Sequence, residues 1–112
     1  MENKLTILWT TDNIVTVEKM VFMYAHNAIL MGWWEEVTIV IWGASARLAA
    51  ENKDVQAKLK EMQDAGVKIE ACKACSDDLG VTTTLSDRGV DVKYWGQPLT
   101  DILKKEGKII TI

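Results

Sequence analysis

Short apolar segments separated by polar and turn-forming residues divide the chain into alternating strands and helices. Each apolar segment is rich in β-branched or aromatic residues and has the length of an ordinary strand. The second segment is apolar almost throughout, which is typical of a strand covered by helices on both faces. The pattern predicts strands at residues 5–9, 37–42, 67–71, 90–94 and 108–112.

Helical patterns fill the intervals between these strands. Asp12 or Asn13 can cap a helix that runs to about Met31 and stops at Gly32. Apolar residues surround most of this helix, so we expect cover on most of its sides, from its own sheet and from a neighbouring subunit. Other helices are predicted at residues 44–50, about 55–65, 76–79 and 98–105, and residues 80–89 form either a turn of helix or a loop.

This alternation of strands and helices is typical of βαβ units with a mainly parallel sheet. We therefore predict an α/β fold, a three-layer α/β/α sandwich around a mainly parallel five-stranded sheet. The chain has 112 residues, 48% of them hydrophobic, which suits one hydrophobic core and leaves no room for a second domain. Residues 1–112 are accordingly expected to form a single domain.

Charge and hydropathy argue against two classes of partner. The formal net charge is −3 and no Lys/Arg run is longer than residues 104–105, so no positive surface is predicted for nucleic acid or an anionic membrane. The most apolar stretch, residues 14–34, is interrupted by charged residues and cannot supply a membrane-spanning run. The N-terminus leads directly into a strand without a signal-peptide core, so we expect a cytoplasmic protein.

Candidate functional residues gather where the predicted strands end. In a parallel sheet all strands end at one edge, and open α/β folds bind ligands outside those carboxyl ends. Three of the five tryptophans and both cysteines fall at this edge. The residues predicted to line a site there are Trp9, Thr10, Thr11, Asp12, Trp42, Gly43, Ser45, Cys72, Lys73, Cys75, Trp95 and Gly96.

The two cysteines, Cys72 and Cys75, have Cys-x-x-Cys spacing and are the candidate catalytic residues. A thiol at the first turn of a helix meets backbone N–H groups that favour the thiolate, and Lys73 would add to this effect. Asp77 and Asp78 would act in the opposite direction, so the net effect on the thiol pKa stays open. The alternative is that both cysteines are inert hydrophobic side chains between a helix and the sheet.

Two kinds of Cys-x-x-Cys chemistry fit the chain poorly. Thioredoxin-like proteins place a cis-proline ahead of a strand opposite the cysteines, whereas the sole proline, Pro98, is predicted to begin a helix. A structural zinc site needs about four ligands, and two cysteines with one histidine supply fewer, so zinc could be held only across a subunit boundary. We predict no metal and no cofactor.

Three other features favour ordinary structural roles. His26 lies in the middle of a predicted helix, and a packed histidine with one hydrogen bond is expected there rather than a catalytic base. Residues 43–45 could present N–H groups to an anion, but one glycine is weak support. Trp33 and Trp34 are expected to cover the start of the second strand or an interface.

Several short motifs distributed along the chain match those of a known family. They are Thr10-Thr11-Asp12, Tyr24-Ala25-His26-Asn27, Gly32-Trp33-Trp34, Trp42-Gly43-Ala44-Ser45, Gly66-Val67-Lys68-Ile69-Glu70-Ala71-Cys72, Gly80-Val81 and Gly96-Gln97-Pro98-Leu99-Thr100. Through these motifs the chain resembles the DsrE/DsrF-like (DsrEFH) sulfur-relay family over nearly its whole length. The better-studied members of this family pass sulfur between proteins as a cysteine persulfide.

The resemblance implies a role for each cysteine. Cys72 matches the sulfur-accepting cysteine, which ends the third strand and precedes a Gly-Val pair, here Gly80-Val81. Cys75 is absent from the simplest relay subunits and would resolve or share the sulfur. Relay subunits carry basic residues before the Gly-Val pair, where this chain has residues 77–79, Asp-Asp-Leu, which implies a different docking partner or none. The family also implies a trimer or hexamer.

Three functions follow from these patterns. The first is a sulfurtransferase-type persulfide carrier that loads Cys72 from a donor protein and delivers to an acceptor. The second is a non-catalytic oligomer that binds a small ligand in a Trp-lined pocket. The third is a dithiol reductase that uses Cys72 and Cys75.

Overall fold

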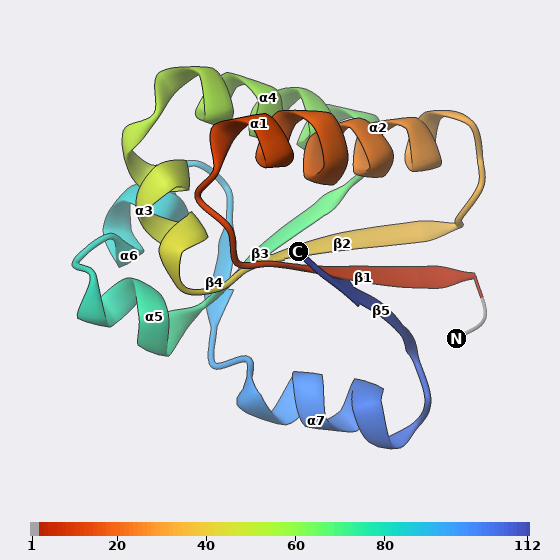
Figure 1. Cartoon of the computed structure of the whole chain (residues 1–112). Coiled ribbons are helices and arrows are strands. Elements are labelled where there is room, and N and C mark those ends of the chain that lie inside the picture. The colour runs from red at the N-terminus through yellow and green to blue at the C-terminus, as the bar shows by residue number, and fades with distance from the viewer. Residues whose placement is uncertain (1–2) are drawn as a thin grey trace.

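Five parallel strands form one sheet in the order β4-β3-β2-β1-β5 (Figure 1). The computed structural model describes residues 3–112. Every pairing is parallel, which confirms the predicted sheet. Its strands are β1 (Lys4–Trp9), β2 (Glu36–Ile41), β3 (Lys68–Cys72), β4 (Asp91–Lys93) and β5 (Lys108–Thr111).

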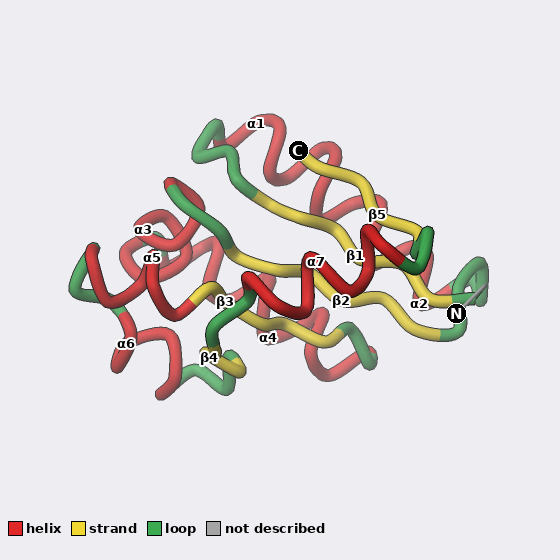
Figure 2. Tube along the Cα trace, turned by 90° about the horizontal axis from the view of Figure 1, so that it is seen from below, coloured by secondary structure: helices red, strands yellow, loops and turns green. Residues whose placement is uncertain are grey.

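Helices cover the sheet on both faces, so the predicted three layers are confirmed. In Figure 1 the long helical segment after β1 and the helix α4 lie on one face, and α7 lies alone on the other. Figure 2 shows the sheet from the side of α7. The helices are α1 (Ile14–Thr16), the π-helix η1 (Val17–Phe22), α2 (Met23–Leu30), α3 (Ala44–Glu51), α4 (Lys53–Ala65), α5 (Lys73–Asp78), α6 (Thr82–Asp87) and α7 (Gly96–Lys104).

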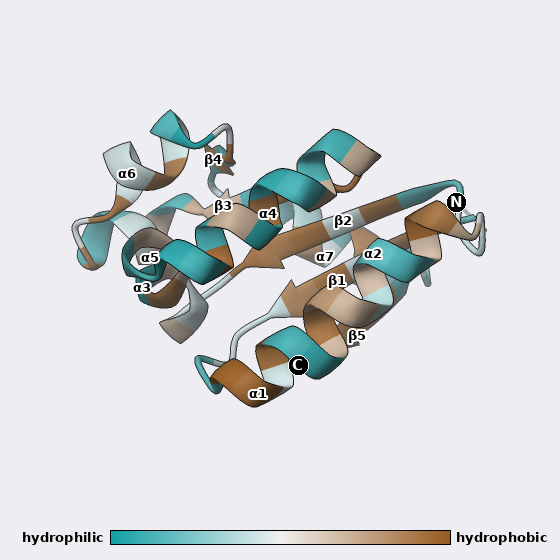
Figure 3. Cartoon of the chain, turned by 90° about the horizontal axis from the view of Figure 1, so that it is seen from above, coloured by the Kyte–Doolittle hydropathy of each residue, from teal (hydrophilic) through white to brown (hydrophobic). Residues whose placement is uncertain are grey.

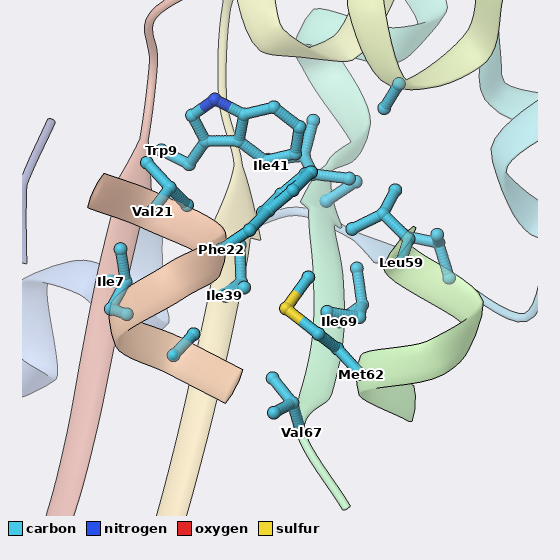
Figure 4. Close-up of a cluster of buried hydrophobic side chains, with 14 of the residues drawn as sticks. Ile7, Trp9, Val21, Phe22, Ile39, Ile41, Leu59, Met62, Val67 and Ile69 are labelled. Carbon is cyan, nitrogen blue, oxygen red and sulfur yellow. The ribbon is translucent and has the colours of Figure 1, made fainter. Parts of the chain in front are cut away.

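The larger core lies between the sheet and the α1–α2 and α4 layer (Figure 4). Side chains alternate between the two faces of a strand, and this alternation sends the buried residues of β1 into that core. Trp9 at the end of β1 meets Phe22 edge to face, with ring centroids 5.2 Å apart, a geometry that aromatic pairs prefer. Burial of these two rings joins the end of β1 to the helix that follows it.

A smaller core lies on the opposite face, under α7. Its buried residues are Val40 of β2, Cys72 of β3 and Trp95. Partly buried side chains from β1, α5, α7 and the turn after β2 complete it: Leu8, Trp42, Cys75, Leu99 and Ile102. Both cysteines therefore belong to the cluster on the face that α7 covers.

The predicted regular helix after β1 contains a π-helical segment, η1. Asn13, not Asp12, caps its start by accepting a hydrogen bond from the Thr16 backbone N–H at 3.1 Å. A π turn holds more residues than an α turn, and all the buried residues of η1, Val17, Val21 and Phe22, belong to the larger core. Apolar spacing alone does not distinguish this geometry from a continuous α-helix.

One helix boundary differs from the prediction, and a segment predicted as either helix or loop is helical. The helix predicted to begin at Ser76 begins at Lys73, directly after Cys72. Residues 80–89, for which a helical turn or a loop was predicted, contain the helix α6. Figure 3 shows that apolar residues recur along α1 and α2, yet no helix within residues 3–112 is long and apolar enough to cross a membrane.

Truncation of Phe22 should destabilise the fold strongly. The ring is 1% exposed and packs on Trp9, so Phe22→Ala should lower the free energy of unfolding by about 3–5 kcal/mol. Lys19→Ala on the exposed surface of the same segment should change it by less than about 0.5 kcal/mol. Urea denaturation measures both variants, and equal midpoints would contradict the packing described above.

Candidate functional site

Cys72 and Cys75 lie at the carboxyl edge of the sheet, where β3 passes into α5. Cys72 is the last residue of β3 and the N-cap of α5, and Cys75 lies one turn further along. Both thiols are free. They differ in access to solvent, because Cys72 is only 5% exposed whereas Cys75 is half-buried.

Cys72 is covered by a tryptophan that polar contacts hold in place. Trp95 packs in the same cluster as Cys72, and its indole N–H donates to Oε1 of Glu70 at 2.9 Å. Lys93 forms an ion pair with the same carboxylate at 3.0 Å and lies 5.9 Å from the Trp95 ring centre. The Trp95 side chain that covers Cys72 is therefore held in a fixed position by these contacts.

Cys75 opens into a groove of about 590 Å³ at the same edge. The groove runs between α3 and α5 and includes the loop before α1. Its lining residues are Asp12, Gly43, Ala44, Arg47, Leu48, Glu51, Cys75, Asp78 and Leu79. Cys72 does not line it, so the two cysteines present one accessible thiol and one covered thiol.

The pKa of the Cys75 thiol is raised above its ordinary value. Burial is the largest cause, and the neighbouring Cys72 thiol and the charge of Asp78 raise the pKa further. The backbone N–H of Gly43 acts in the opposite direction and lowers the pKa. Gly43 has φ = 73°, and a residue with a side chain would be strained in this backbone conformation.

The Lys73 ammonium group contacts Asp77 and Tyr94. It forms an ion pair with Asp77 at 2.7 Å and lies 5.3 Å from the Tyr94 ring centre. This pairing with Asp77 raises the pKa of Lys73, and Lys73 in turn lowers the pKa of Asp77. Of the two acidic residues expected to oppose ionisation of a thiol, Asp78 is the one that acts on Cys75.

The polar residues after β1 and β2 make structural contacts at this edge. The Ser45 hydroxyl is fully buried and donates to the Trp9 carbonyl at 2.6 Å. It also accepts a hydrogen bond from the Trp42 backbone N–H at 3.0 Å, so it ties the ends of β1 and β2 together. Thr10 donates to the carbonyl of Ile112 at 3.0 Å.

The three strand-end tryptophans do not line one pocket. Trp9 is fully buried in the larger core, with its indole N–H donating to the Thr11 carbonyl at 2.8 Å. Trp42 and Trp95 belong to the smaller core on the other face. Gly96 begins α7 on that face and is exposed.

Of the residues that line the groove, only Asp12, Gly43 and Cys75 were predicted as site residues from the sequence. Arg47 and Leu48 fall in the helix predicted at residues 44–50 and Glu51 directly follows it, and all three form the α3 side of the cavity that Cys75 opens into. Their spacing along α3 was the available signal, since residues three and four apart share a helix face. His26 is half-buried on α2, and no group of three or more potential metal ligands exists within residues 3–112.

Iodoacetamide should modify Cys75 before Cys72. Cys75 opens into the groove while Cys72 is covered, and alkylation requires both access and thiolate. The pKa of Cys75 is raised by its surroundings, which include Cys72 and Asp78. The other charged groups that line the groove are Arg47, Glu51 and Asp12. The rate of Cys75 alkylation should therefore rise about tenfold per pH unit between pH 7 and 8. Peptide mapping checks both, and earlier labelling of Cys72 would contradict the assignment.

Comparison with known proteins places the chain in a family. A solved structure of a conserved protein of unknown function, BT1422 from Bacteroides thetaiotaomicron, is similar with a TM-score of 0.96 and 46% identity, covering 98% of this chain and 95% of that chain. MTH1491 from Methanobacterium thermoautotrophicum, also of unknown function, shares the fold at 16% identity, with a TM-score of 0.79 and coverage of 99% and 100%.

A third solved structure, the ychN protein from E. coli, shares the fold with a TM-score of 0.65 and 16% identity, and the match covers 100% of both chains. No curated protein shows significant similarity to the chain. The model of the DsrE/DsrF-like family matches residues 4–111. With nearly the whole chain matched and the fold shared, the protein belongs to the DsrE/DsrF-like family.

Proposed function

We propose that this protein carries sulfane sulfur as a persulfide on the Cys72/Cys75 pair. The observation that supports the proposal most directly is the position of two free, adjacent thiols at the carboxyl edge of a DsrE/DsrF-like sheet. Open α/β folds place their chemistry at this edge. Donor and acceptor would be other proteins or thiols in a compartment that keeps both cysteines reduced, for which we propose the cytoplasm.

Cys72 is the better of the two positions for storing sulfur. A persulfide is lost when a thiolate attacks it, and the attack requires access. Trp95 covers Cys72, and the Glu70 carboxylate fixes Trp95, so low-molecular-weight thiols would reach a sulfur held there only slowly. Cys75 contacts Cys72, and its thiolate can release the sulfur from a Cys72 persulfide by exchange.

Neither of the other functions has comparable support. A Trp-lined pocket would need the strand-end tryptophans on one surface, but Trp9 is buried on the opposite face from Trp42 and Trp95. A dithiol reductase also uses adjacent thiols, but the match to the DsrE/DsrF-like family favours sulfur transfer over disulfide reduction. The experiment below separates these functions from a carrier.

Intact mass spectrometry after exposure to a persulfide donor tests the proposal. The unchanged protein should gain the mass of one sulfur atom, and a Cys72→Ser/Cys75→Ser double variant should gain none. Cys72→Ser alone should lose any sulfur it acquires about tenfold faster to added glutathione, because the sulfur then lies on the accessible thiol. Sulfide alone, which contains no sulfane sulfur, is the reagent control. A protein that gains no sulfur in any form is not a carrier.

We also propose that the protein is a homo-oligomer with an interface on the α1–α2 segment. Large apolar side chains are exposed there and in the turn that follows, which single surface residues do not explain. They are Val15 (65%), Leu30 (63%), Met31 (66%) and Trp33 (54%). A second copy of the chain would cover them, as expected for a family of trimers and hexamers.

Charged substitutions on this segment should dissociate the oligomer. Val15→Glu combined with Leu30→Glu should lower the sedimentation coefficient to that of a monomer, because burying unpaired carboxylates in an interface is unfavourable. Leu103→Glu is the matched control, since Leu103 is 59% exposed on α7, on the other face of the sheet. If the double variant keeps the sedimentation coefficient of the original protein, the interface lies elsewhere. If the original protein is itself a monomer, the proposal is overturned.

A further inference from the structure

The groove beside Cys75 is a separate feature from the cover over Cys72. It is bounded by α3 on one side and α5 on the other, and Leu48 and Leu79 contribute apolar side chains to it. Its volume of about 590 Å³ is in the range of small-molecule sites rather than of protein interfaces. Cys75 is the only thiol that reaches it.

Cys75 also contacts the smaller core that contains Cys72. It packs against the cluster of Val40, Cys72 and Trp95, and the Cys72 thiol affects its pKa directly. Cys75 thus touches the groove on one side and the covered thiol on the other. A sulfur atom arriving from the groove meets Cys75 first.

The rim of the groove is predominantly acidic. Asp12, Glu51 and Asp78 contribute carboxylates, and Arg47 contributes the one cationic group among the lining residues. Within residues 3–112 none of these four side chains makes an ion pair or a side-chain hydrogen bond. Three carboxylates against one guanidinium leave a negative rim, which attracts a cationic ligand and repels an anionic one.

We propose that sulfur enters this protein at Cys75, delivered in the groove by a small persulfide that carries an ammonium group, and then passes to Cys72. The proposal rests on the proposed function and adds the first acceptor thiol and the class of donor. It assigns the groove to a low-molecular-weight donor because of its volume and charge.

Two exchange steps move the sulfur without net oxidation. The Cys75 thiolate attacks the terminal sulfur of the donor persulfide, the S–S bond of the donor breaks, and the donor leaves as a thiolate that takes up a proton. The Cys72 thiolate then attacks the terminal sulfur on Cys75, that S–S bond breaks, and the Cys75 thiolate regains a proton.

Quenched-flow loading followed by mass spectrometry tests the proposal. The probes are cysteamine persulfide, which is cationic, and N-acetylcysteine persulfide, which is anionic, each generated from its disulfide and sulfide. The loading rate with each donor is divided by the rate at which the same donor transfers sulfur to a small free thiol, whose pKa matches that of the protein thiol. The intrinsic reactivity of each donor then cancels. The unchanged protein should then favour the cationic donor about tenfold.

Variants separate the first thiol from the charge effect. Cys75→Ser should load at least about tenfold more slowly with either donor, because Cys72 is covered. Cys72→Ser should keep the initial rate, with the sulfur found on Cys75. Asp78→Asn combined with Glu51→Gln should abolish the preference for the cationic donor. Asp64→Asn should preserve it, because Asp64 is exposed near the C-terminal end of α4 and does not line the groove. Circular dichroism confirms that each variant is folded.

Each part of the proposal fails in its own way. If Cys75→Ser loads at the unchanged rate and carries sulfur on Cys72, Cys75 is not the first acceptor, although the protein is still a carrier. If the anionic donor is equal or faster, the groove does not select an ammonium persulfide. If no form of the protein gains sulfur, the proposed function itself fails.

Discussion

The burial of β2 on both faces is the constraint on which the other features depend. From Val37 to Ile41 every residue of this strand is buried, so one face must be covered by the α1–α2 and α4 layer and the other by α7. Its hydrogen-bonded neighbours β1 and β3 end level with it, because Ile41 pairs with Trp9 and with Ala71. The edge that carries the cysteines is therefore a consequence of aligned strand ends.

The turn after β2 links this constraint to the thiols. Ser45 holds the ends of β1 and β2 together through a buried hydroxyl, and a buried hydrogen bond of this kind contributes about 1 kcal/mol. Gly43 in the same turn adopts a positive φ and lines the groove together with Cys75. A core packing requirement in β2 thus places the turn that forms one side of the groove beside Cys75.

The sheet, its parallel direction and the position of its functional edge were predictable because they depend on local apolar pattern and on general rules of parallel folds. The distribution of the strand-end tryptophans was not deduced, although β1 alternates and Trp9 shares a face with Leu5 and Ile7. The early start of α5 was missed because Lys73 and Ala74 give no capping signal. The π-helical segment was missed because its buried positions resemble those of an α-helix.

Cys72 rather than Cys75 is covered because of contacts between residues that are distant in sequence. Trp95 reaches Cys72 only because β4 pairs with β3, and Glu70 of β3 fixes its indole. The resulting asymmetry matters for sulfur chemistry, since loading requires an accessible thiolate and retention requires protection from other thiols. A single cysteine must satisfy both requirements by moving. Two cysteines one helical turn apart, one in a groove and one under a tied tryptophan, can satisfy them in a rigid structure.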